Sequence, residues 1–139
     1  MGLNIVAKRK YDLSEFAEGW DGAHVIVTVP NAKDRQAYVD FMGQMQEEMN
    51  AELEPLTAKH LIKAVAAKYD DIAEKKVTEM AITLIRSGAV VSTNEGDDTS
   101  ELVQFAKKDV ADVVSALGFA WTNDIVATAL GNNGLKAKN

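Results

Sequence analysis

The chain has 139 residues, of which 47% are hydrophobic and 26% are charged, a composition typical of one folded domain spanning residues 1–139. It contains no cysteine, which excludes disulfides, thiolate metal sites and thiol nucleophiles. Its net charge of −6 disfavours nucleic acid as a partner, and no stretch approaches the ~20 apolar residues of a membrane span. These properties favour a cytoplasmic protein that does not bind membranes.

Residues 3–7 and 25–29 are rich in β-branched side chains, which suit the pleated surface of a strand. Between them, Gly19 and Gly22 flank an acidic turn residue, so the chain can reverse direction there. The first 30 residues are therefore predicted to form an antiparallel β-hairpin.

A helix is predicted to follow, because Pro30 ends the second strand and Asn31 can cap the next element. Its polar side carries glutamine and glutamate, and it extends to about residue 53, before Pro55. Its apolar stripe at helical spacing consists of Tyr38, Phe41, Met42, Met45 and Met49.

The remaining chain also has mainly helical periodicity. Thr57 is a predicted cap, and residues 57–87 form either two helices or one bent helix that stops at Gly88. Residues 92–98 are polar and turn-rich, which indicates a loop.

Two further helices are predicted near the C-terminus. Thr99 or Ser100 caps the first, which Gly118 closes, and Asn123 caps the last. Residues 131–139 are predicted to be a frayed tail. The predicted fold is α+β and predominantly helical, with the β-hairpin packed on a bundle of four to five helices in residues 31–130.

Catalytic signatures are missing from the sequence. His24 and His60 lack the spacing of a metal pair, and no serine stands in a nucleophile elbow. Glu48 and Glu52 share a helix face, but their polar neighbours predict a solvated surface. We therefore expect no enzyme activity, no catalytic residues, no metal site and no cofactor.

A partner surface is the remaining candidate for function. Methionine adapts to varied apolar partners, and tryptophan is enriched at binding hot spots. The same residues would also suit the protein's own core, so both interpretations stay open. The candidate partner-binding residues are Tyr38, Phe41, Met42, Met45, Met49, Trp20 and Trp121.

The first third of the chain contains a pattern of aromatic, glycine and β-branched residues that consists of Tyr11, Leu13, Phe16, Gly19, Trp20, Gly22 and residues 25–29. With this pattern the chain resembles small tailed-bacteriophage proteins from the tail-gene region, and the nearest class is the phage tail assembly chaperone. The resemblance implies a non-enzymatic protein of the host bacterial cytoplasm. It would bind apolar helices of the tape measure protein and help to recruit tail tube protein.

Three alternatives stay open beside the chaperone. A structural component of the tail or head–tail connector would persist in the virion, whereas a chaperone would be absent from it. A small enzyme or a regulatory protein would have a polar pocket instead of an apolar groove. The sequence also leaves open whether the protein is a homo-oligomer.

Overall fold

The computed structural model describes residues 7–93 and 99–131, so the strand predicted at residues 3–7 and the tail predicted at 131–139 lie almost wholly outside the described part. Within it, β1 (Lys8–Asp12) pairs antiparallel with β2 (His24–Thr28). An antiparallel N-terminal hairpin is confirmed, but its first described strand covers residues 8–12 and not the predicted 3–7. Between them, Leu13 and Ala23 are fully buried, and the Leu13 amide donates to the Ala23 carbonyl at 2.8 Å.

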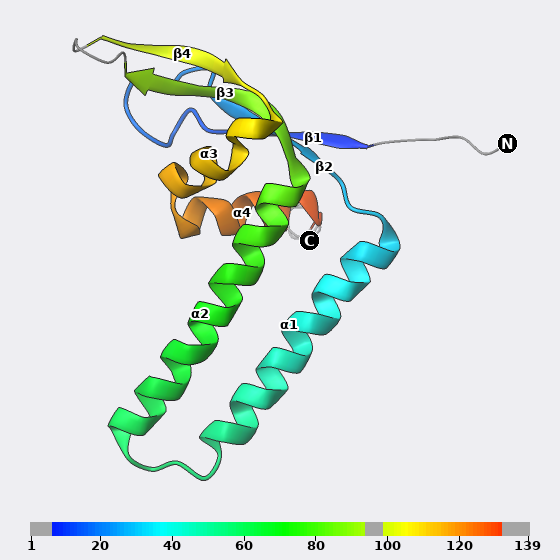
Figure 1. Cartoon of the computed structure of the whole chain (residues 1–139), viewed down its shortest axis with the longest axis vertical. Helices are drawn as coiled ribbons and strands as arrows, with labels where there is room; N and C mark the ends of the chain where they lie inside the picture. Colours follow the sequence, from blue (N-terminus) through cyan, green and yellow to red (C-terminus); the bar gives the residue numbers. More distant parts are fainter. Residues whose placement is uncertain (1–6, 94–98, 132–139) are drawn as a thin grey trace, which may run out of the picture. The chain divides into compact units, whose positions relative to one another are not determined.

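Within the described residues, the sheet has four antiparallel strands in the order β1-β2-β3-β4, and not only the predicted N-terminal hairpin. β3 (Ile85–Thr93) pairs with both β2 and β4 (Ser100–Phe105), as Figure 1 shows. The helix predicted from Thr99 or Ser100 is therefore wrong over residues 100–105. Their side chains alternate between the two faces of the sheet, with Phe105 buried.

Gly88 does not end a helix, contrary to the prediction, but lies inside β3. A Cβ atom at this position would lie 2.7 Å from a ring carbon of Phe105 and would also collide with the carbonyl oxygen of His24. Glycine is needed here because two neighbouring strands leave no room for a side chain.

The long helices are α1 (Ala32–Leu53) and α2 (Lys59–Leu84). The predicted cap of α1 is confirmed, because the side chain of Asn31 accepts a hydrogen bond from the Asp34 amide at 2.8 Å. α2 is one helix and not two. The Ala58 carbonyl accepts its first hydrogen bonds, so the helix begins one residue later than a cap at Thr57 predicts.

Two shorter helices complete the described fold. A 3₁₀ turn, η1 (Lys107–Asp109), leads into α3 (Val110–Leu117), and α4 (Phe119–Ala129) follows. Gly118, at φ 85°, separates them, which confirms the predicted end of the first helix. The second helix begins at Phe119, earlier in the chain than the predicted cap Asn123. α3 contacts β3 and α4 contacts β1, and Figure 1 shows both helices below the strands.

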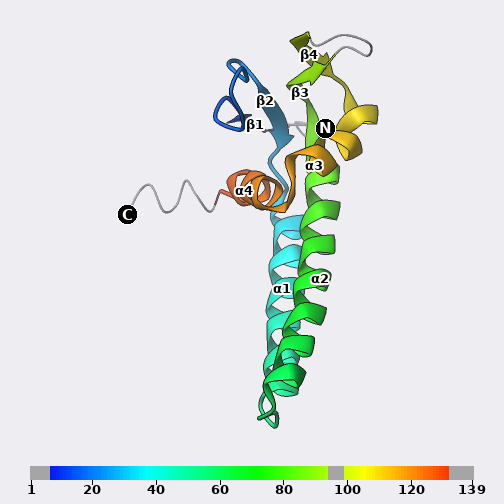
Figure 2. The ribbon, with the colours of Figure 1, turned by 90° about the vertical axis from the view of Figure 1, so that its left-hand side faces the viewer.

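The chain divides into two units, residues 1–29 with 78–139 and residues 30–77. We call the first the sheet unit and the second the helical hairpin. The hairpin contains α1 and most of α2, which lie side by side in both views (Figure 2). The fold is thus α+β with four α-helices among the described residues, and the single-domain organisation stays a prediction. None of these helices combines the length and the apolar character needed to cross a membrane.

Candidate functional site: a groove on the helical hairpin

The apolar stripe predicted on α1 is only partly covered. Tyr38 is buried, whereas Met42, Met45 and Met49 are half-buried and Phe41 keeps 39% of its surface exposed. Two helices alone cannot enclose an apolar stripe on each, because each helix covers only one side of the other. The hairpin therefore leaves apolar surface accessible.

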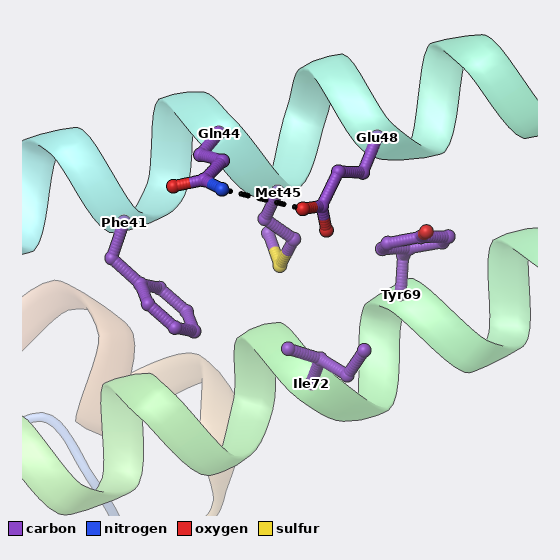
Figure 3. A pocket seen from close by; sticks show the side chains of 6 residues that line it. All are labelled: Phe41, Gln44, Met45, Glu48, Tyr69 and Ile72. Carbon is purple, nitrogen blue, oxygen red and sulfur yellow. Dashed lines mark hydrogen bonds between the residues drawn. The ribbon is translucent and has the colours of Figure 1, made fainter.

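Part of this surface forms a groove between α1 and α2 (Figure 3). Its volume is about 280 Å³. One water molecule needs roughly 10–15 Å³ of cavity volume, so the groove is large enough to accept side chains of another molecule. Phe41, Gln44, Met45, Glu48, Tyr69 and Ile72 line the groove.

A polar contact holds the two helices together at one end of the groove. The Tyr69 hydroxyl donates to the Glu52 carboxylate, and the Lys68 ammonium lies 3.1 Å from the same carboxylate. The hydrogen bond from Tyr69, with help from Lys68, lowers the pKa of Glu52. The hydrogen bond to Glu52 raises the pKa of Tyr69 from 10.0 to about 12. Tyr69 is thus a neutral donor and Glu52 a charged acceptor at neutral pH.

A cation and an aromatic ring meet toward the other end. The Lys76 ammonium on α2 lies 4.7 Å from the ring centroid of Phe41 on α1, a distance suited to a cation–π interaction. Between the two ends, Gln44 donates a long hydrogen bond of 3.4 Å to Glu48 on the same helix. The floor is apolar and the rim carries amide, hydroxyl and carboxylate groups (Figure 3).

The candidate tryptophans lie in the sheet unit and not in the hairpin. Phe16 joins them, with its ring centroid 4.5 Å from that of Trp20 and 5.5 Å from that of Trp121. Tyr11 meets Trp121 edge to face at 6.3 Å, and its hydroxyl donates to Asp124 at 2.5 Å. All four rings are half-buried. This aromatic cluster ties the β1–β2 connection to α4.

The structure therefore separates the seven predicted site residues. It brings Phe41 and Met45 into the groove, leaves Tyr38, Met42 and Met49 out of its lining, and places both tryptophans in the aromatic cluster. Sequence reasoning missed Tyr69 and Ile72 as groove residues. Both residues belong to α2, and they line the groove only once the two helices pair.

The described residues contain no group of three or more histidine, aspartate or glutamate side chains arranged to hold a metal ion. His24 lies on β2, and its Nδ1 is 2.9 Å from the Gly22 carbonyl oxygen, a local contact within the turn. His60 lies exposed near the start of α2. The groove itself contains neither histidine nor serine.

No protein-family model matches the sequence, and no curated protein or solved structure is significantly similar to the chain.

Proposed function

We propose that the protein is a non-enzymatic binding protein whose helical hairpin docks an apolar helix of a partner, acting as a phage tail assembly chaperone. The observation that carries this proposal is the incomplete burial of the hairpin. Phe41 exposes 39% of its surface in a groove whose floor is formed by the half-buried Met45 and Ile72. By the resemblance of the first third of the chain, the clients are the tape measure protein and, in tail tube assembly, the tube protein.

The mechanism needs no covalent chemistry. A client helix that places an apolar side chain against Met45 and Ile72 removes apolar surface from water, at about 25 cal/mol per Å². The unbranched thioether of Met45 can adjust to client side chains of different shape. The excess of acidic residues gives the protein a net charge of −6, which helps to keep such a complex in solution.

A matched pair of variants tests this proposal. Met45→Ser removes an apolar group from the groove, whereas Val39→Ser removes one from the same helix outside the groove lining. We expect Met45→Ser to reduce the amount of tape measure protein kept soluble on co-expression, and Val39→Ser to retain it. Circular dichroism of both variants checks that the helices remain. Equal loss, or no loss, in the two variants would show that the groove is not the docking site.

The virion-component alternative makes a different prediction. A chaperone leaves the assembled tail, whereas a component remains in it at a fixed number of copies. Mass spectrometry of purified virions should therefore find no peptides of this chain. Their presence in stoichiometric amounts would replace the chaperone role with a structural one, even if the groove binds a helix.

A further inference from the structure

One carboxylate in the groove lacks a cationic partner. Glu48 receives only the 3.4 Å hydrogen bond from Gln44, and within the described part of the chain it takes part in no ion pair. The negative charge of Glu48 is nevertheless felt by Tyr69 on the facing helix, because it contributes to raising the pKa of that hydroxyl. Glu48 is therefore an acceptor on the rim with no cation of the hairpin to balance it.

Three lysines of α2 that are close in sequence to the groove residues Tyr69 and Ile72 are already engaged. Lys68 pairs with Glu52 at 3.1 Å, Lys75 pairs with Asp71 at 3.1 Å, and Lys76 lies over the Phe41 ring. Moving any of them to Glu48 would break an existing contact. Glu48 is exposed, so its carboxylate is accessible to a cation carried by another molecule.

The apolar lining fixes where such a charge would stand. Met45 and Glu48 are three residues apart on α1, so their side chains project from the same side of the helix about one turn apart (Figure 3). A ligand helix that places an apolar side chain at Met45 would bring a residue three or four positions along itself close to Glu48.

We infer that the groove selects amphipathic helices in which a lysine or arginine follows or precedes the docked apolar residue by one turn, through an ion pair with Glu48. This specificity rests on the proposed docking function. It adds a charge criterion to an otherwise unspecific apolar contact, and rejects helices that carry a glutamate or aspartate at the same place.

Two synthetic peptides of about 20 residues test the inference, a length at which alanine-rich sequences form helices. Both carry the same leucine stripe. At each position that lies one helical turn from a leucine and is not itself a leucine, one peptide has lysine and the other has glutamate. Fluorescence anisotropy with the full-length protein measures their dissociation constants. We expect the lysine peptide to bind about fivefold more tightly, and the difference to shrink as salt is raised to about 1 M.

Charge reversal on the protein provides the decisive comparison. Glu48→Lys should reverse the preference, so that the glutamate peptide binds more tightly. Glu47→Lys makes the same charge change one residue away, outside the groove lining, and should keep the wild-type preference. Because both variants change the net charge equally, general electrostatic attraction cannot account for a difference between them.

The outcomes separate this inference from the proposed function. If both peptides bind equally and Glu48→Lys changes nothing, the groove docks helices without selecting charge, and the inference fails alone. If Glu47→Lys and Glu48→Lys reverse the preference equally, the selection belongs to overall charge, and the inference again fails. If neither peptide binds at concentrations up to about 1 mM, the docking function fails as well.

Discussion

The sheet unit and the helical hairpin differ in how completely they bury their apolar side chains. In the sheet unit, Leu13, Val25, Val27 and Ile85 are fully buried. In the hairpin, all of which the structure describes, only Tyr38, Tyr69 and Val77 are buried among the apolar and aromatic residues. The comparison teaches that the sheet unit has a fully buried apolar core. The helical hairpin buries few apolar side chains and leaves the others accessible to a partner.

The largest effect is expected in the sheet unit, at Gly88. Gly88→Ala would force a Cβ atom into the backbone of β2 and the ring of Phe105, which are both fixed by the sheet. We expect a loss of about 3 kcal/mol in the free energy of unfolding, measured by urea denaturation. A stability equal to that of the wild type would show that the strands are not packed as closely as described.

The junction between α2 and β3 is the next most sensitive place. The Lys107 ammonium donates to the carbonyl oxygens of Ile82, Thr83 and Ile85 at 2.6, 3.0 and 2.7 Å. It thus satisfies two carbonyls in the last turn of α2 and the first carbonyl of β3. Lys107→Met removes these bonds and should lower the free energy of unfolding by about 2 kcal/mol. Lys108→Met, the neighbouring control, should change it by less than about 0.5 kcal/mol. Equal effects of the two substitutions would contradict this role for Lys107.

A glycine substitution in the hairpin should act in the opposite direction from Gly88→Ala. Gly43 lies in the middle of α1, and a Cβ atom there meets no other atom within 4 Å. Gly43→Ala should therefore stabilise the hairpin by about 1 kcal/mol, because alanine has the higher helix propensity. Helix content followed by circular dichroism during heating measures this gain. A loss of stability would mean that α1 is more closely covered than the structure indicates.

The smallest expected effect is a pH dependence confined to the hairpin. The pKa of Tyr69 is raised from 10.0 to about 12, so its hydrogen bond to Glu52 contributes fully below pH 10 and is lost between pH 10 and 12. The pKa of Glu52 is lowered, so the same contact is also lost as the pH falls through the lowered value.

Tyr69→Phe tests this dependence, because it keeps the ring and removes only the hydroxyl. In the variant, hairpin melting temperatures at pH 9 and pH 11.5 should differ less than in the wild-type protein. A difference as large as that of the wild type would assign the alkaline loss to other groups.

Local chemistry made part of the fold predictable. The β-branched run at residues 25–29 and the capping side chain of Asn31 each act on their own neighbours, so β2 and the start of α1 could be read directly. β4 could not, because Leu102, Val103 and Phe105 have spacings that fit a helix as well as a strand. Pairing with β3 decides between them. A signal for the β3–β4 hairpin was available in two β-rich stretches that flank the turn-rich residues 94–98.

The groove was half predictable for a similar reason. Phe41 and Met45 belong to one helical stripe, which periodicity reveals. Ile72 and Tyr69 meet them only because α1 and α2 pair as a hairpin, and that register depends on contacts between residues far apart in sequence, such as Tyr69 with Glu52. The two tryptophans were grouped with the methionines by residue type alone, whereas the fold assigns them to the aromatic cluster of the sheet unit.

Hydrogen–deuterium exchange, with and without the lysine-bearing peptide, tests the central claim most directly. Without the peptide, amides of α1 and of residues 59–77 should exchange faster than those of β2 and β3, because the hairpin has fewer buried contacts. With the peptide, protection should rise in the hairpin around residues 41–48 and 69–72 and stay constant in the sheet unit. Equal protection of both units in the free protein, or new protection confined to the sheet unit, would contradict the account.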